Sequence, residues 1–368
     1  MASIINTSLM HEVIDKMDYM VRVMDADHKV IYMNKKMLEE FGHTMGHICY
    51  ELLSRNEKCD HCVTSGSRET GQPDTKDVAI GEKYYKVMSS PVSIDDGSNY
   101  SIELLHDITE QKKTEDELLR HYKKLKADIE FAKHIQNRAL PIDGEYWNAV
   151  HMSSVYLPSE DLGGDIYDII KIDEDKTLLY IADVSGHGVR SSLLTIFLRQ
   201  LIRGLTYEAA VDLKELLDVL VKSYNDLGID EEHYLSVLFC SYDKKKGEVT
   251  IMNAGHNCLP LIIKKDGEIE EIVVRGMPVC SLIKEPNHEQ VKINVKSGDR
   301  ILLYTDGITE VFSKKSDKPF GLEGIIKIIR ENPELQGSAL TNKIIDEVKE
   351  FASISPIDDM AILVAELL

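Results

Sequence analysis

Four aspartate positions in the second half of the chain share one context, in which an apolar, strand-like run meets an Asp beside a turn. The four are Asp165 after a Gly-Gly pair, Asp183 before Val-Ser-Gly-His-Gly, Asp306 before a Gly, and Asp358, followed by Asp359, before the apolar run 360–364. A single Asp of this kind is typical of a turn. Several carboxylates at strand ends repel one another unless cations compensate, and Mg²⁺ and Mn²⁺ choose oxygen ligands. The pattern therefore predicts divalent-cation binding, and two such ions close together can activate a water and hold a phosphoryl group.

A second group of chemically active residues lies in the first half of the chain, where Cys49, Cys59 and Cys62 cluster. Two residues separate Cys59 from Cys62, which is the spacing of thiolate metal sites and of redox pairs. With His47 or His61, the three thiols would supply four ligands for Zn²⁺ or an iron–sulfur cluster. A set of reduced, partly buried thiols is the alternative, and the sequence leaves both open. The remaining cysteines lie in apolar stretches, as packing residues do: Cys240, Cys258 and Cys280.

The aspartates need strands that hold them, and the second half of the chain supplies strand patterns. We predict strands at residues 178–182, 234–242, 249–253, 259–264, 300–304 and 360–367. Helical patterns lie between them, at residues 191–205, 213–226, 324–330 and 340–351. Hairpin-like turns at residues 253–257 and 265–267 join successive strands. The sheets are therefore expected to be largely antiparallel.

The first half of the chain reads as a small α+β domain that ends near Ile108. Residues 18–34 predict a β-hairpin, and Asn34 is a candidate cap for a helix at residues 35–41. A polar stretch with several glycines follows, and residues 83–92 and 100–105 then alternate in the manner of strands.

Residues 109–140 differ from both halves, because they are dense in charge and contain neither Gly nor Pro. Residues spaced alternately by four and three predict a coiled-coil seam: Leu118, Tyr122, Leu125, Ile129, Ala132, Gln136 and Ala139. We expect this seam to join two copies of the chain in a parallel homodimer, with Leu118, Leu125 and Ile129 as its apolar contacts and Gln136 as a polar residue that tunes register. A single amphipathic helix that lies on its own domain is the alternative. Pro141 ends the helix.

The bulk composition limits the classes of partner. The chain has 368 residues, which suits two domains, and 43 basic against 63 acidic residues give a net charge of −20. Such a charge disfavours nucleic acid and anionic membranes as partners. No apolar run approaches the ~20 residues that cross a bilayer, and the first residues lack the pattern of a signal peptide. We therefore expect a cytoplasmic protein.

The motifs of the second half, taken together, resemble the metal-dependent protein phosphatases of type 2C, and most closely the bacterial SpoIIE/RsbU branch. The matching segments are residues 135–141, 163–168, 183–188, 253–256, 304–307 and 358–360. The resemblance implies an αββα sandwich of two antiparallel sheets with metals at one edge. It implies Asp165, Asp183, Asp306 and Asp358 as catalytic ligands of two Mn²⁺ or Mg²⁺ ions, joined by the carbonyl of Val184. It also implies supporting places beside the ligands for Gly164 and Asp359.

The sequence departs from the eukaryotic branch of this family at several points. That branch has a phosphate-binding Arg shortly before the first Asp, and residues 158–162 contain none. His187 is displaced from the branch's conserved His position, which leaves its role as a general acid open. The Gly-x-Pro-Leu-Gly turn appears as residues 276–280 with one Gly missing, which removes no ligand. We interpret His256, in a turn between two strands, as a structural residue bonded to backbone.

The first half resembles a PAS domain over residues 8–110, through its hairpin, Asn34 and the exit sequence 106–110. We therefore predict a PAS-like sensor at residues 1–110, a coiled-coil linker at 111–141 and an α+β phosphatase domain at 142–368. The ligand of such a sensor does not follow from its fold.

The expected function is signal-regulated hydrolysis of phosphoserine or phosphothreonine on a partner protein. The resemblance implies a STAS-type anti-sigma factor antagonist as that partner. A catalytically weak signalling or binding module is an alternative, although all four aspartates are present. A diguanylate cyclase is a further alternative, suggested by Gly163-Gly164-Asp165, but the Ile-Tyr that follows does not continue that signature.

Overall fold

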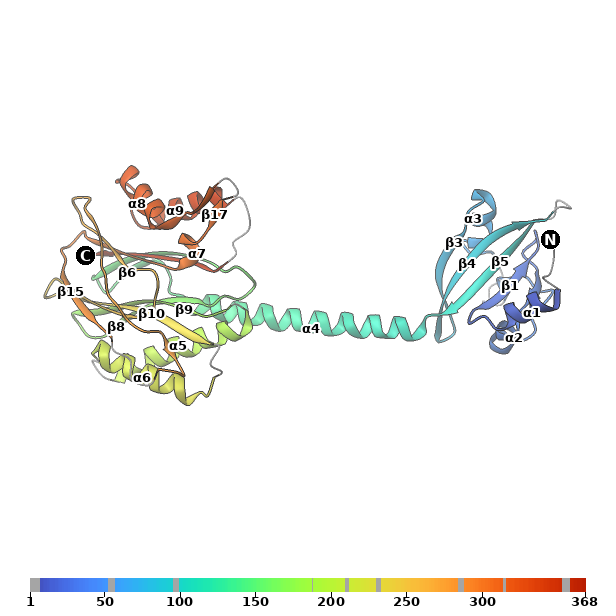
Figure 1. Ribbon diagram of the computed structural model, residues 1–368, viewed down its shortest axis with the longest axis horizontal. Coiled ribbons are helices and arrows are strands. Elements are labelled where there is room, and N and C mark those ends of the chain that lie inside the picture. Colours follow the sequence, from blue (N-terminus) through green and yellow to red (C-terminus); the bar gives the residue numbers. More distant parts are fainter. Residues whose placement is uncertain are drawn as a thin grey trace. The chain divides into compact units, whose positions relative to one another are not determined.

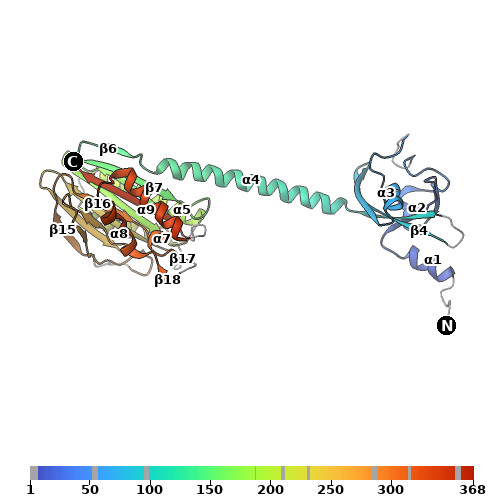
Figure 2. The same ribbon diagram turned by 90° about the horizontal axis from the view of Figure 1, so that it is seen from above.

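The computed structural model describes residues 7–51, 57–94, 99–186, 188–208, 212–229, 233–283, 288–313, 316–352 and 358–368. The chain divides into two compact units, Met1–Lys124 and Leu125–Leu368. The division falls within helix α4 (Thr109–Ala139), which is continuous (Figures 1 and 2). In the described part of the chain, no helix combines the length and the apolar character that a bilayer crossing requires.

The N-terminal unit is built on one antiparallel sheet in the order β2-β1-β5-β4-β3. Its strands are β1 (Met20–Met24), β2 (Val30–Met33), β3 (Asp74–Ile80), β4 (Lys83–Ser93) and β5 (Asn99–Asp107). Its helices before α4 are α1 (Thr7–Asp15), α2 (Lys35–Phe41) and α3 (Val63–Thr70). Helix α3 and strand β3 lie in the stretch that the sequence pattern left without structure, because neither carries a clear apolar period.

The predicted hairpin and helix cap of the N-terminal unit are confirmed. Strand β1 pairs with β2, and Asn34 is the N-cap of α2. The Asn34 side chain accepts the N–H of Met37 at 3.0 Å and that of Val21 at 2.9 Å, and it donates to the Tyr19 carbonyl at 2.9 Å. Because the side chain is fully buried, these bonds satisfy groups that water does not reach.

The described part of the C-terminal unit is built around two six-stranded antiparallel sheets. The first has the order β15-β11-β10-β9-β8, with β14 pairing with β10: β15 (Gln290–Asn294), β11 (Glu248–Ala254), β10 (Tyr234–Asp243), β9 (Lys176–Val184), β8 (Asp165–Lys171) and β14 (Val279–Cys280). The second has the order β13-β12-β16-β19-β7-β6: β13 (Ile269–Glu271), β12 (Leu261–Ile263), β16 (Arg300–Tyr304), β19 (Met360–Leu367), β7 (Val150–Leu157) and β6 (Gly144–Tyr146).

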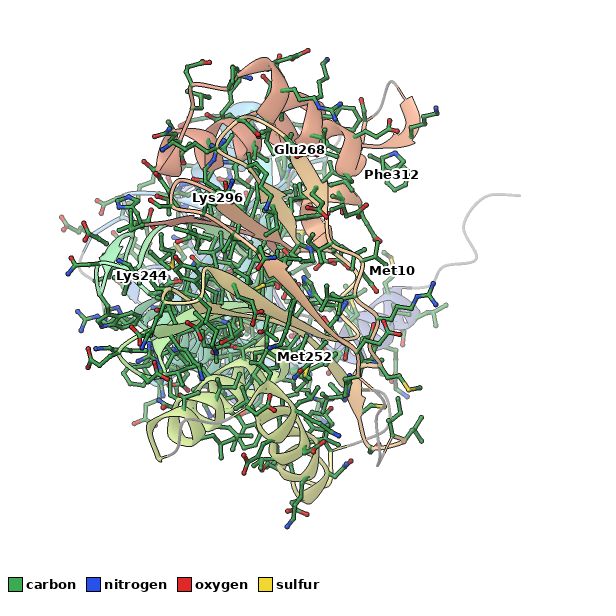
Figure 3. All side chains as sticks on the ribbon, turned by 90° about the vertical axis from the view of Figure 1, so that its left-hand side faces the viewer. Met10, Lys244, Met252, Glu268, Lys296 and Phe312 are labelled. Atoms are coloured by element: carbon green, nitrogen blue, oxygen red, sulfur yellow. The ribbon has the colours of Figure 1, made fainter. Side chains whose placement is uncertain are left out.

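Helices cover the outer face of each sheet (Figures 1 and 3). Helices α5 (Val189–Glu208) and α6 (Leu213–Asp226) pack on the first sheet, and α8 (Gly321–Glu331) and α9 (Gly337–Ala352) pack on the second. The short elements α7 (Asp306–Thr309), β17 (Phe312–Ser313) and β18 (Ser316–Pro319) follow β16. The predicted pair of antiparallel sheets with helices outside is confirmed.

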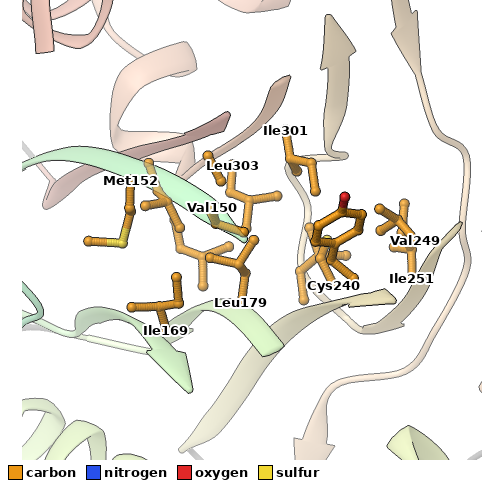
Figure 4. Close-up of a cluster of buried hydrophobic side chains, with 14 of the residues drawn as sticks. Val150, Met152, Ile169, Leu179, Cys240, Val249, Ile251, Ile301 and Leu303 are labelled. Atoms are coloured by element: carbon orange, nitrogen blue, oxygen red, sulfur yellow. The ribbon is translucent and has the colours of Figure 1, made fainter. Parts of the chain in front are cut away.

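Successive side chains along a strand point to opposite faces of the sheet, so one strand contributes to two hydrophobic cores. On β8, Tyr167 and Ile169 point into the space between the sheets, whereas Ile166 and Ile170 point toward the helices α5 and α6. Figure 4 shows the core between the sheets, where Ile169 from β8 and Leu179 from β9 face side chains of β7 and β16. The strands thus read as almost continuous apolar runs because both of their faces are buried.

One charged residue interrupts the helix-facing side of β8. Asp168 is fully buried, and Arg203 of α5 donates Nε and Nη2 to its two carboxylate oxygens at 2.6 and 2.8 Å. Nε of Arg199, one turn earlier on α5, lies 3.1 Å from the same carboxylate. The two guanidinium groups compensate the buried charge and fix α5 against β8.

Candidate active site

The predicted aspartates gather at one edge of the C-terminal unit, which we call the acidic edge and define by Asp165, Asp183, Asp306 and Asp358. Asp165 begins β8 and lies directly opposite Asp183 of β9 in the strand pairing. Both continue the rows of side chains that point between the sheets, since Asp165 is two residues from Tyr167 and Asp183 is two residues from Ile181. Strand register and alternation therefore bring the first two carboxylates together.

The carboxylates of the acidic edge act on one another electrostatically. Burial raises the pKa of Asp165 well above its usual range, and the charge of Asp183 adds to that effect. Burial also raises the pKa of Asp183 to about 7, with further contributions from Asp306, Asp358 and Asp359. A set of carboxylates that disfavour each other's ionised form attracts cations.

Thr305 ties the two sheets together at the acidic edge. Its hydroxyl donates to Oδ2 of Asp165 at 2.7 Å and accepts the N–H of Ala361 at 2.9 Å. The bond to Asp165 therefore runs from the first sheet to the end of β16 in the second. Sequence reasoning missed this residue, although its place directly before Asp306 was a signal that its side chain would share the site.

Asp359 supports the loop before Asp165. Its Oδ2 accepts the N–H of Gly164 at 2.5 Å, and its Oδ1 accepts the N–H and the hydroxyl of Ser159 at 2.7 and 2.9 Å. Asp359 is buried, whereas the neighbouring Asp358 is exposed and accepts the Asp359 N–H at 2.8 Å. Asp359 therefore fixes the main chain of the loop before Asp165, whereas Asp358 faces outward.

Main-chain oxygens approach the same loop. A Cβ added at Gly164 would meet the carbonyl oxygens of Val184 and Gly186 at 2.5 and 2.9 Å. No side chain fits there, so the glycine lets these two carbonyls lie against the loop. A Cβ at Gly307 would likewise collide with the carbonyl of Asp359, which keeps the Asp306 turn close to the start of β19.

The donor set of the acidic edge suits hard divalent cations. It combines carboxylate with carbonyl oxygens and contains no thiolate, which is the chemistry that Mg²⁺ and Mn²⁺ prefer. Within the described ranges, no three His, Cys, Asp or Glu side chains form a group that holds a metal ion by itself. His187 lies outside the described residues.

Gln136 does not lie where the coiled-coil pattern predicted. It is buried inside the C-terminal unit, and its Nε2 donates to the Gly163 carbonyl at 2.7 Å. Its Oε1 accepts the Gly163 N–H at 3.3 Å. The prediction that Gln136 tunes register against a partner helix is therefore wrong. The repeat continues in the sequence, but the last turn of α4 packs on its own unit and contacts the loop that precedes Asp165.

The other seam residues are accessible. Leu118, Tyr122 and Leu125 are 69%, 60% and 59% exposed, and Ile129 is partly exposed. Large apolar side chains on a helix are usually covered.

The structural interpretation of His256 is confirmed. The side chain is buried, its Nε2 lies 3.0 Å from the Tyr304 carbonyl oxygen, and its Nδ1 lies 3.2 Å from the Ser236 hydroxyl. Burial lowers its pKa to about 4, so the imidazole is neutral at physiological pH. It donates to the carbonyl from Nε2 and accepts the hydroxyl at Nδ1, and thereby links β10 of the first sheet to β16 of the second.

The three clustered cysteines lie in the N-terminal unit. Cys49, Cys59 and Cys62 are partly exposed and line one cavity. These three thiols, His47 and His61 are all among the described residues, and they do not form a group of three or more side chains that could hold a metal ion.

Three comparisons bear on this arrangement. A family model described as Stage II sporulation protein E (SpoIIE) matches residues 173–368, more than half of the chain. Phosphoserine phosphatase RsbP of Bacillus subtilis is 26% identical over 231 residues, which cover 61% of this chain and 53% of RsbP. Phosphoserine phosphatase RsbU of the same species is 22% identical over 242 residues, which cover 65% of this chain and 70% of RsbU. The SiaA-PP2C domain of Pseudomonas aeruginosa aligns with a TM-score of 0.56 and 17% identity, over 67% of this chain and 98% of that domain. The match to this chain thus spans about half the length of RsbP. The structural alignment shows that the sandwich has the PP2C fold.

Proposed function

Because this chain belongs to the SpoIIE family, we propose that it is a metal-dependent phosphatase that hydrolyses phosphoserine or phosphothreonine on a partner protein. The observation that carries the proposal is the pair formed by Asp165 and Asp183, which face each other across two strands. The charge of Asp306 acts on both members of the pair and that of Asp358 acts on Asp183, which supports a shared site. Two relatives named phosphoserine phosphatases support the substrate class.

We assign the ligands of two Mn²⁺ or Mg²⁺ ions to the side chains of Asp165, Asp183, Asp306 and Asp358 and to the Val184 carbonyl. When bound, such ions supply an acidified water and neutralise the phosphoryl oxygens. Thr305 orients the Asp165 carboxylate through its hydrogen bond. Asp359 keeps the loop at Gly164 in place. The protein thereby holds ligands in position before substrate arrives.

A phosphate-release assay on the full-length protein tests the proposal. The probes are p-nitrophenyl phosphate, a phosphoserine peptide and a serine-phosphorylated STAS-domain protein. We expect release with Mn²⁺ or Mg²⁺, loss of release with EDTA, and recovery when the metal is returned in excess. No release from any probe with either metal would contradict the proposal and favour a signalling module without activity. Release from the STAS protein well above that from the peptide would support an anti-sigma factor antagonist as substrate.

We further propose that the N-terminal unit is a PAS-like sensor and that α4 transmits its state to the acidic edge. The five-stranded antiparallel sheet with short helices is consistent with this class of module. The hydrogen bonds between Gln136 and Gly163 connect α4 directly to the loop before Asp165. A continuous helix transmits a rotation or a change of register better than a flexible tether. The exposed residues Leu118 and Leu125 support a parallel homodimer through this helix.

The dimer predicts a defined result for Leu125→Lys combined with Ile129→Lys. Two cations placed on the seam should dissociate the dimer, because burying them against the same residues of a partner leaves charges unpaired. We expect a monomer by light scattering and a changed specific phosphatase activity, with an unchanged thermal transition of the C-terminal unit.

Ala127→Lys is the matched control, since Ala127 is exposed and two residues beyond Leu125, on the opposite face of the seam. This variant should keep the oligomeric state and the activity of the parent chain. A parent chain that is monomeric at all practical concentrations, with activity unaffected by the seam substitutions, would refute the dimer and leave the phosphatase proposal intact.

A further inference from the structure

The N-terminal unit contains a cavity of about 30 Å³ that is lined by all three clustered thiols. One water needs ~10–15 Å³ of such space, so the cavity accommodates a molecule of the size of water or hydrogen peroxide. Most of its wall is apolar and comes from α2, α3 and the sheet, with the buried ion pair between Arg22 and Glu103 on one side. A cavity this small, with Cys49, Cys59 and Cys62 on its wall, suits thiol chemistry with a very small reagent.

Cys62 has the surroundings of a reactive thiol. It is the N-cap residue of α3, where the N–H groups of Thr64 and Ser65 and the Ser65 hydroxyl are nearby donors that favour its thiolate. Burial alone would raise the pKa of Cys62, but these donors and the nearby Lys58 more than offset burial and lower it. A helix N-terminus with several donors stabilises a thiolate, which is the nucleophilic form.

Three other cysteines of the chain contrast with Cys62. Burial raises the pKa of Cys49 to about 11 and that of Cys240 to about 12. Burial also raises the pKa of Cys258. These thiols stay protonated at neutral pH and react slowly. Cys59 is partly exposed, lines the same cavity and lies two residues before Cys62 in the loop that enters α3.

His28 extends the set of groups around Cys62. Its Nε2 lies 3.4 Å from the Ser65 hydroxyl, and its Nδ1 is buried with no hydrogen-bond partner among the described residues. Burial, followed by the charges of Arg68 and Lys58, lowers the pKa of His28 and keeps the ring neutral. A neutral imidazole beside Ser65 is a proton acceptor for the Ser65 hydroxyl.

We propose that Cys62 is a peroxide-reactive thiol whose oxidation is captured by Cys59 as a disulfide. The Cys62 thiolate attacks one oxygen of hydrogen peroxide, the O–O bond breaks, and sulfenic acid and water form once the leaving oxygen takes a proton. The Cys59 thiol then attacks the Cys62 sulfur, the S–O bond breaks, and a second water leaves. The two thiols lose two electrons and peroxide gains two, so the balance closes with one disulfide and two waters. Such a bond would fix the loop before α3 and close one wall of the cavity.

The test treats reduced, full-length protein with a small excess of hydrogen peroxide and counts thiols after denaturation. We expect two of the six thiols to disappear, a bond between Cys59 and Cys62 in non-reduced peptide maps, and full recovery with dithiothreitol. Cys62→Ser and Cys62→Ala should keep their five thiols. Cys59→Ser should lose one thiol and give a sulfenic acid on Cys62 that dimedone traps. Ser65→Ala should slow the reaction roughly 10-fold, as the loss of one pKa unit of thiolate stabilisation would.

Cys280→Ser is the matched control, because Cys280 is a buried thiol of the C-terminal unit, and it should lose two of its five thiols at the parent rate. Six intact thiols in the treated parent chain would overturn the proposal. Equal oxidation of Cys62→Ser or Cys62→Ala, with a thermal transition like that of the parent, would do so as well. The count needs no phosphatase activity, so its outcome is independent of the proposed function.

Discussion

Asp183→Asn and Asp306→Asn should each reduce metal-dependent phosphate release by at least ~100-fold, since losing a ligand costs more than losing a residue that only supports one. Asn keeps the shape of the side chain but removes the charge that holds the cation, and it is the cation that would lower the pKa of its bound water. The fold should survive, because each substitution removes one of several carboxylates that repel one another at the acidic edge. Initial rates at saturating phosphosubstrate and low metal, with thermal unfolding beside them, provide the measurement.

Asp218→Asn is the control for this pair. Asp218 is an exposed residue of α6, so the same change of charge there should leave turnover and its metal dependence unaltered. Parent-like turnover in both Asp183→Asn and Asp306→Asn at low metal would refute the ligand assignment. A loss of activity accompanied by unfolding would instead call for Glu substitutions at the two positions, which keep the charge and displace it by one methylene group.

Asp168→Ala should destabilise the C-terminal unit by about 3–5 kcal/mol, because it leaves the guanidinium groups of Arg199 and Arg203 without their buried counter-charge. The side chain of Arg199 is 15% exposed and cannot recover much hydration. Urea unfolding followed by circular dichroism measures the change. We expect activity to fall as well, since β8 carries Asp165 three residues before Asp168, and α5 follows the loop after Asp183.

Glu174→Ala separates a buried ion pair from an exposed one. Glu174 pairs with Lys171 at the end of the same strand, but its side chain is 92% exposed. Its removal should leave the unfolding transition where it is, because water and salt screen such pairs. A parent-like stability of Asp168→Ala would show that the two arginines reach solvent after the substitution and that the ion pair does not hold α5.

The sandwich could be predicted because its strands carry strong local signals. Runs such as β9 and β19 are apolar on both faces, and turns rich in Gly and Asn separate β11 from the strand that follows it. In the N-terminal unit the capping residue Asn34 predicted where α2 begins. Helix α3 gave no such signal, because its cap residue is Cys62, whose side chain makes no capping bond, and its sequence is mostly polar. Its stability comes from packing, which a local pattern does not contain.

Within the site, sequence identified acidic residues but not their neighbours. Asp165 and Asp183 could be identified because an Asp at the end of an apolar run, close to Gly, is recognisable from the sequence alone. The bond from Thr305 to Asp165 joins residues 140 positions apart, so only the assembled sheets reveal it. Gln136 shows a different kind of error. It does follow the heptad spacing, but it contacts its own unit and not a partner helix. A period identifies one face of a helix and leaves open which surface covers that face.

The pairing of β7 with β19 sets the order in which this unit can assemble. Strand β19 lies between β16 and β7, so the second sheet has a gap in its middle until residues 360–367 have left the ribosome. Pairings of such long sequence separation form slowly, because a large loop has to close before any contact stabilises it. Ser159 and Asp359 meet across 200 residues in the same step. During synthesis the edges of β7 and β16 that pair with β19 therefore stay unpaired, and a nascent chain has no complete acidic edge until Asp358 has been made.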